Sequence, residues 1–215
     1  MFILGDHNSI ANQYLSEIRD AEIQRDRWRF RKNMEHLGLL MAYEMSKDLS
    51  YKNQEVKTPL GISNINLLAE QPILIPILRA AIPFYQGVLS IFNKADSGFI
   101  GAYRKVLNSN HDFDINTDYM ALPDITGRHV VLIDPMLASG KSIVKTMGDL
   151  AQFGKPSRVD IMVVIAAPEG IAYVKHNLKM DYSLWVGAID EKLNEKSYII
   201  PGLGDAGDLA FGEKI

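Results

Sequence analysis

The sequence predicts an α/β fold in which a central, mostly parallel sheet is flanked by helices. Apolar runs, each short enough for one buried strand, alternate along the chain with segments of helical periodicity. The predicted strands cover 71–81, 97–105, 128–134, 158–168 and 181–190, and the predicted helices cover 10–48, 83–92, 141–154 and 169–177. Strands that alternate with helices form parallel βαβ units, whose sheet is covered on both faces. A chain of 215 residues is long enough to bury such a core.

The first element, residues 10–48, is predicted as helix. Its apolar side chains recur at steps of three and four residues, as on the buried face of a helix: Trp28, Phe30, Met34, Leu37, Leu40, Met41 and Met45. A basic cluster lies at the start of this stripe and consists of Arg25, Arg27, Arg29, Arg31 and Lys32. We interpret the cluster as a solvated or interface-facing turn, with an anion site as the alternative.

Two strands, a helix and a polar segment follow. The run "QPILIPILRAA" (71–81) is typical of a buried strand that ends at Arg79, and Pro83 suits the first turn of the next helix. Residues 97–105 then predict a strand. The polar segment 106–123 has two interpretations, a long hairpin arm or a mobile loop. Long loops in compact domains are often functional.

The loop "DPMLASGKS" (134–142) joins the next predicted strand to its helix. It ends in Gly-Lys-Ser, as does the phosphate loop of nucleoside triphosphatases. That loop needs a glycine separated from Gly140 by four residues, where this chain has Pro135, and proline has no N–H to offer a phosphate. The sequence therefore argues against a triphosphatase.

The same loop still predicts an anion site. Small residues let a phosphomonoester approach the backbone closely, and the amides and dipole of the following helix favour negative charge there. Ser139 and Ser142 add hydroxyl donors, and Asp134 at the end of the strand is placed to bind sugar hydroxyls or a cation. We expect a site for a sugar phosphate. The structural alternative is an ordinary turn with Ser139 as the helix cap.

The composition excludes several classes of function. Cysteine is absent, so there is no disulfide, thiol nucleophile or thiolate metal site. The net charge of -3 and the pI near 6.0 give no broad basic surface for nucleic acid. No apolar run reaches the ~18 residues of a membrane span, and the apolar start "MFIL" is too short for a signal peptide. We expect a soluble, cytoplasmic protein, and its 5 histidines show no metal-ligand spacing.

Five segments, in order along the chain, resemble those of one family. The loop 134–142 resembles the loop that binds phosphoribosyl diphosphate (PRPP) in type I phosphoribosyltransferases, and its Asp-Pro-Met-Leu start is similar to that of the uracil phosphoribosyltransferases. The other matching segments are "PILRA" (76–80), "GAYR" (101–104), "VVIAAPEGIA" (163–172) and "YIIPGLGDAGDLAFG" (198–212). The last of these is the most specific and indicates uracil as the base.

The resemblance implies the type I phosphoribosyltransferase fold, with one domain over residues 1–215. Within it we expect an N-terminal helical segment (1–50), an arm or flexible loop (105–121) and a base-binding hood (191–215). The implied reaction belongs to pyrimidine salvage: the phosphoribosyl group of PRPP passes to N1 of uracil, giving UMP and diphosphate. The main alternative is a PRPP-binding regulatory protein of the same fold with weak or no catalysis.

Site residues follow from the resemblance by position. Arg79 and Arg104 would bind the diphosphate, and Asp205 would also lie near PRPP. The ribose and its 5′-phosphate would be held by the loop residues Asp134, Pro135, Met136, Leu137, Ala138, Ser139, Gly140, Lys141 and Ser142. The base would be lined by Ile199, Gly204, Asp205 and Ala206. Among these, Asp134, Arg104 and Asp205 are the candidate catalytic residues.

The charge of the leaving group sets the remaining expectations. Diphosphate carries several charges, so it needs guanidinium donors and Mg²⁺, bound mainly through the diphosphate itself. A glycine-rich hood pairs its backbone with the carbonyls and N–H groups of uracil, and it would leave groups unpaired against cytosine. The resemblance also implies a homodimer or higher homo-oligomer, with GTP as a candidate effector.

Some residues depart from the family pattern, and one acid of the hood is left out of the expected site. Lys141 stands where the family commonly has glycine, and we expect a solvated residue at the helix start. Lys105 and Val106 stand where acidic residues are usual, which makes the arm divergent. Asp208 is interpreted as a turn-forming acid.

Overall fold

The computed structural model describes residues 1–106 and 113–213, and for 102–106, 113–116 and 118 it describes the backbone alone. Within these residues a nine-stranded sheet has the order β1-β11-β10-β8-β4-β6-β7, with β5 beside β4 and β9 beside β10. Its strands are β1 (Phe2–Ile3), β4 (Ile73–Leu78), β5 (Asp96–Ser97), β6 (Phe99–Val106), β7 (Phe113–Ala121), β8 (His129–Ile133), β9 (Met136–Leu137), β10 (Arg158–Ala166) and β11 (Ser183–Ile189). Every pairing is parallel except that of β6 with β7.

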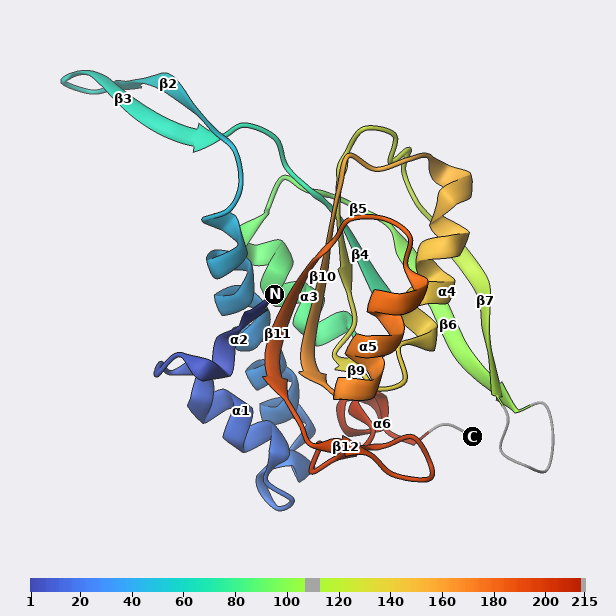
Figure 1. Cartoon of the computed structure of the whole chain (residues 1–215). Helices are drawn as coiled ribbons and strands as arrows, with labels where there is room; N and C mark the ends of the chain where they lie inside the picture. Colours follow the sequence, from blue (N-terminus) through green and yellow to red (C-terminus); the bar gives the residue numbers. More distant parts are fainter. Residues whose placement is uncertain (107–112, 214–215) are drawn as a thin grey trace.

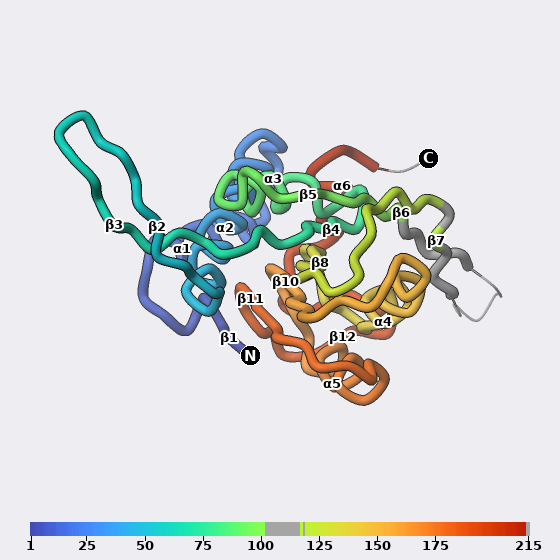
Figure 2. The backbone as a smooth tube through the Cα atoms, turned by 90° about the horizontal axis from the view of Figure 1, so that it is seen from above, coloured from blue at the N-terminus to red at the C-terminus, as the bar shows by residue number. Residues whose placement is uncertain are grey.

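Helices cover both faces of this sheet (Figure 2). One face carries α1 (Ala11–Arg19), α2 (Arg27–Ser46) and α3 (Ile82–Ile91), and the other carries α4 (Lys141–Leu150) and α5 (Pro168–Asn177). Short 3₁₀ turns lie at η1 (Leu4–Asp6), η2 (Ile23–Arg25) and η3 (Ala151–Phe153). The predicted fold class, a mostly parallel sheet flanked by helices, is confirmed.

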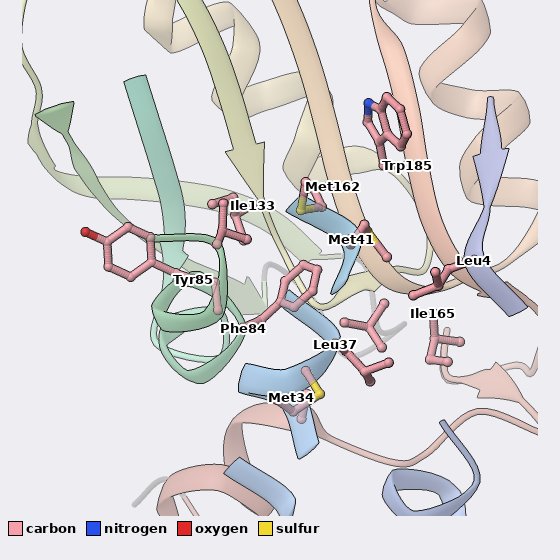
Figure 3. Packing of buried hydrophobic residues seen from close by; sticks show 14 of the residues in the cluster. Leu4, Met34, Leu37, Met41, Phe84, Tyr85, Ile133, Met162, Ile165 and Trp185 are labelled. Atoms are coloured by element: carbon pink, nitrogen blue, oxygen red, sulfur yellow. The ribbon is translucent and has the colours of Figure 1, made fainter. Parts of the chain in front are cut away.

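The packing of the core explains why the strands could be predicted from the sequence. Successive residues of a strand face opposite sides, so a strand covered on both faces is apolar throughout. On the α2 face, Met34, Leu37 and Met41 pack with Phe84 of α3 and Met162 of β10, all fully buried (Figure 3). The other face is filled by a second cluster, in which α4 and α5 pack on the same strands.

The expectation of continuous helix over 10–48 is wrong. Two helices form, because two aspartates bond to the backbone between them. Asp20 Oδ1 accepts from the Ile23 N–H at 2.9 Å, and Asp26 caps α2 by accepting from the N–H groups of Trp28 and Arg29. Trp28, expected in the buried stripe, is 64% exposed. Aspartates that bond to nearby amides favour turns and helix starts over helix interiors.

The basic cluster at this helix start is engaged mainly by the protein itself. Arg29 bonds twice to Glu17, and Arg31 Nη1 donates to the carbonyl of Ala210 at 2.8 Å. Lys32 and Arg25 pair with acids three residues away on the surface. These contacts favour the interpretation as a solvated turn over the anion site.

Two hairpins leave the body of the molecule. The strands β2 (Tyr51–Thr58) and β3 (Gly61–Leu68) form one that projects far from the sheet (Figure 1), and the sequence analysis did not anticipate it. The second consists of β6 and β7, which run antiparallel where a hairpin arm or a mobile loop was expected. Residues 107–112, within that expected arm, lie outside the described residues.

The C-terminal segment crosses the carboxyl end of the sheet. The strands β12 (Lys192–Leu193) and β13 (Ile199–Ile200) form a small ribbon, and α6 (Ala206–Phe211) follows it. In Figure 1, β10 and β11 point toward this ribbon and helix. Among the helices that the structure describes, none has the length and apolar character needed to cross a bilayer.

Candidate active site

A cavity of about 960 Å³ lies at the carboxyl ends of β4 and β8. This is where open α/β sheets bind their ligands. Its walls come from four places in the chain: the end of β4, the loop after β8, the β6–β7 hairpin and the C-terminal segment. Segments more than 120 positions apart, such as those of Arg79 and Gly207, therefore meet around one space, and all of them were singled out in the sequence.

Hydrogen bonds hold the start of the loop after β8 in place. Pro135 is buried and its carbonyl accepts from the N–H groups of Val164 and Ile165, both at 3.0 Å. Asp134 Oδ1 accepts from the Met136 N–H at 3.1 Å, which turns the chain away from the strand. Its carboxylate lies at the cavity wall. The predicted loop residues Met136, Leu137, Ala138, Ser139, Gly140 and Ser142 also line the cavity, whereas Pro135 and Lys141 do not.

Gly140 is the cap of α4, so the alternative interpretation of this loop, in which Ser139 caps the helix, is wrong. Gly140 has φ +77°, and no side chain bonds to the first amides of the helix. A Cβ at this position would lie 2.7 Å from the carbonyl oxygen of Gly170, so glycine is required for both shape and space. Gly140, Ser142 and Ile143 all line the cavity, so the N-terminus of α4 lies at its wall, where a helix favours an anion. Lys141 beside it is exposed.

Arg79 stands directly after β4 and is held by the C-terminal segment. Its Nη2 donates to Asp208 Oδ1 at 2.9 Å and to the Gly212 carbonyl at 2.6 Å. Its Nε is buried and, among the described residues, has no hydrogen-bond partner. The guanidinium lines the cavity with donor capacity left over. Asp208, interpreted from the sequence as a turn-forming acid, is instead the ion-pair partner of Arg79.

The C-terminal segment forms the remaining wall. Ile199 and Ala206 are nearly fully buried, and they line the cavity together with Gly204 and Asp205. Asp205 caps α6 through Oδ1, which accepts from the Asp208 N–H at 3.0 Å. All four residues expected around the base are thus brought together.

Sequence reasoning missed part of this wall. Ser197, Tyr198, Gly207 and Glu213 also line the cavity. All four fall inside the expected hood, 191–215, and none of them was given a role. Their positions follow from the course of the ribbon β12–β13 and of α6, which local pattern does not reveal.

The hairpin contributes Gly101 of β6 and Tyr119 of β7 to the cavity. Arg104 belongs to β6, where its backbone pairs with Ile115, and its side chain lies outside the described residues. Its role in binding diphosphate stays a prediction.

The ribbon of the C-terminal segment is also tied to α5. Glu169 in the first turn of α5 accepts from the Leu193 N–H at 3.0 Å, and this bond is the main reason that the pKa of the Glu169 carboxyl lies below its ordinary value. The carboxylate is therefore charged at neutral pH, which suits a helix N-terminus. The ribbon is thereby joined to the helix that packs beside the loop after β8.

Known proteins resemble the chain over nearly its whole length. The family model described as "Uracil phosphoribosyltransferase" matches residues 5–213. A uracil phosphoribosyltransferase of Porphyromonas gingivalis is 41% identical over 212 residues, covering 99% of this chain and 98% of that protein. One of Pyrococcus furiosus is 36% identical over 206 residues, covering 94% of this chain and 86% of that protein.

Solved structures agree with these matches. A protein of Aquifex aeolicus superimposes with a TM-score of 0.85 at 32% identity, and 96% of each chain is covered. A hypoxanthine phosphoribosyltransferase of Staphylococcus aureus gives a TM-score of 0.50 at 14% identity over 86% of this chain, which supports the fold alone. The resemblance expected from the five segments is confirmed, and the chain belongs to the uracil phosphoribosyltransferase family.

Proposed function

We propose that this chain transfers the phosphoribosyl group of PRPP to N1 of uracil, forming UMP and diphosphate. One observation supports it above all: the phosphate loop, Arg79 and the glycine-rich C-terminal hood (191–215) line a single cavity. The loop suits a 5′-phosphate, the arginine a diphosphate, and the hood a flat base. A site for only one of these groups would not need all three walls.

The reaction is a displacement at the anomeric carbon of ribose. The bond from C1′ to the diphosphate oxygen breaks, the bond from C1′ to uracil N1 forms, and the N1 proton is lost. The transition state resembles an oxocarbenium ion, as in other glycosyl transfers. The task of the protein is therefore to position both substrates and to stabilise charge.

Each wall has a part in this scheme. The α4 amides, with Ser139 and Ser142, hold the 5′-phosphate, and Asp134 fixes the ribose hydroxyls near the developing positive charge. Arg79 and Arg104 stabilise the departing diphosphate. Asp205 lies beside the base and is the candidate to receive the N1 proton, with solvent and the leaving diphosphate as alternatives.

Mg²⁺ fits this donor set as an ion carried by the substrate. Asp134 and Asp205 offer carboxylate oxygens, which Mg²⁺ prefers, but the described residues contain no group of three acidic or histidine side chains that would hold a metal alone. When bound, Mg²⁺ supplies positive charge to the diphosphate as it leaves.

A base panel tests the function. Purified protein is incubated with PRPP, Mg²⁺ and radiolabelled uracil, hypoxanthine, xanthine or orotate, and nucleotide products are separated by chromatography. We expect labelled UMP from uracil alone. A protein that makes no nucleotide from any base would overturn the catalytic proposal.

We also propose that the working form is a homodimer or higher homo-oligomer, built from one domain per chain. The β2–β3 hairpin supports this. It pairs with no other strand of the described chain, and it exposes Leu60 fully, Ile62 by 67% and Ile65 by 43%. A lone two-stranded hairpin is only marginally stable in water. The cytoplasmic location and a response to GTP stay predictions, the latter checked by assaying activity with and without GTP.

A further inference from the structure

The turn that enters the hood is held by side chains from distant parts of the chain. Asp190 follows β11, and its Oδ2 accepts from the Gly202 N–H at 2.7 Å. Arg19, at the end of α1, donates from Nη1 to the Gly202 carbonyl at 3.1 Å. Both polar backbone groups of Gly202 are thus bonded to side chains.

These two side chains also bind each other. Arg19 donates to Asp190 from Nη1 at 2.9 Å and from Nη2 at 2.6 Å, which is the paired geometry favoured by guanidinium and carboxylate. The Asp190 side chain is 4% exposed and that of Arg19 is 22% exposed. Water therefore competes little for these bonds, and the pair is a rigid clamp.

A third side chain extends the clamp by one residue. With its amide turned so that both atoms are satisfied, Gln24 donates to the carbonyl of Leu203 at 2.9 Å and to that of Ile18 at 3.0 Å. The N-terminal segment thus holds two consecutive carbonyls of the turn, those of Gly202 and Leu203.

The clamped turn connects directly to the cavity wall. Gly202 has φ +62°, and a Cβ there would lie 2.1 Å from the carbonyl oxygen of Ile199. Ile199 and Gly204, on either side of the turn, both line the cavity. Neither Arg19 nor Asp190 is among the lining residues, so they act on the cavity only through Gly202.

We propose that Arg19 and Asp190 are positioning residues that hold the hood backbone in register with the edge of the base. The inference rests on the proposed function, because it presumes that uracil binds at the hood. Hydrogen bonds weaken steeply when their distance or angle is wrong, so recognition by backbone groups depends on a fixed backbone. The side-chain hydrogen bonds of Arg19 and Asp190 within the described chain go to each other and to Gly202, and those of Arg79 go to Asp208 and Gly212.

The same helix provides a matched control. Glu17, also on α1, accepts twice from Arg29, at 3.0 Å for both bonds, and its side chain is 10% exposed. This pair joins α1 to α2 and none of its bonds reaches the hood. Breaking it weakens α1 to a similar degree without releasing the turn.

The test compares Arg19→Lys and Asp190→Asn with Glu17→Gln and wild type. Thermal melting, kcat and the KM values for uracil and for PRPP are measured at a temperature where each variant is folded. We expect about a tenfold rise in KM for uracil in both clamp variants, which corresponds to about 1.4 kcal/mol, with KM for PRPP changed by less than about twofold. Glu17→Gln should melt earlier with both KM values unchanged.

The possible results separate the positioning role of Arg19 and Asp190 from the proposed function. Equal KM values for uracil in Arg19→Lys and wild type, or the same rise in Glu17→Gln, would overturn the positioning role. If Asp190→Asn does not fold, the test relies on Arg19→Lys, which keeps the positive charge beside Asp190. A wild-type protein that makes no UMP would overturn the proposed function, and the positioning role with it, whereas an active wild type with unaffected clamp variants overturns the positioning role alone.

Discussion

The Nη2 atom of Arg79 is engaged by Asp208 and the Gly212 carbonyl, while its Nε is buried with no partner among the described residues. A buried donor without a partner is costly, and an anion in the cavity relieves that cost. The protein contacts also fix the plane of the guanidinium before any substrate arrives. Arg79 is therefore suited to a diphosphate in a way that lysine, with a single charged centre, is not.

Replacing Arg79 by lysine tests this reasoning. Because one ammonium group cannot serve Asp208, Gly212 and a substrate together, we expect KM for PRPP to rise at least about tenfold, or about 1.4 kcal/mol. Steady-state kinetics at saturating uracil provide the measurement. Arg25→Lys is the control, since Arg25 pairs with Glu22 on the surface and its side chain is 72% exposed. Equal KM values in the two variants would contradict the assignment.

Substitutions at two neighbouring residues of the phosphate loop should differ greatly in their effect on PRPP binding. Lys141 is exposed and is absent from the cavity wall, so Lys141→Gly should leave KM for PRPP within about threefold and lower the melting temperature slightly, as glycine costs a helix about 1 kcal/mol. Gly140→Ala should raise KM for PRPP strongly. The added Cβ would lie too close to the carbonyl oxygen of Gly170, on a residue whose φ is in the left-handed region. A large loss of PRPP affinity in Lys141→Gly would show that the lysine binds substrate.

At the scale of elements, the contact between α1 and α2 makes stability depend on pH. Hydrogen bonds from Arg29, then Asn33 and Gln13, lower the pKa of Glu17 from its ordinary 4.5 to about 2. A carboxyl with a lowered pKa in the folded state stabilises it fully above its unfolded pKa, and this stabilisation is lost as protons bind.

Glu17→Gln should therefore remove part of the acid sensitivity. In wild type, the free energy of unfolding in urea should fall between about pH 4.5 and pH 2 as Glu17 protonates. The variant should be less stable than wild type at pH 7, and the gap should close toward pH 2. Curves that stay parallel over this range would show that the Glu17 pKa is not lowered.

Elements buried on both faces could be predicted from sequence, and elements without such burial could not. β10 is apolar because helices cover it twice, and its limits were found to within a few residues. β2 and β3 pair only with each other among the described strands and are largely exposed, so their mixture of polar and apolar residues did not indicate a strand. Within the site, the loop and the hood were found from contiguous residues, whereas Asp208 was undervalued because its partner, Arg79, lies 129 positions away.

For the whole molecule, the projecting hairpin predicts how the chains assemble. Ile65→Lys places a charge on the face of the hairpin where Ile65 and Leu67 are exposed, and we expect a shift toward monomer, measured by light scattering after gel filtration. Asn64→Lys is the control, since Asn64 neighbours it on the opposite face of the hairpin and is also exposed. An unchanged mass for Ile65→Lys at low protein concentration would show that this surface does not join the copies.

The clamp on the hood also sets when the site is completed during protein synthesis. Arg19 and Gly202 lie 183 positions apart, so their bond forms only after Gly202 has been translated. Domains generally fold as units during synthesis, and the base subsite therefore cannot be complete until Gly202 has left the ribosome. A ribosome-bound chain arrested before Gly202 should form no UMP, and its activity should appear only once the turn at Gly202 has emerged and bonded to the first helix.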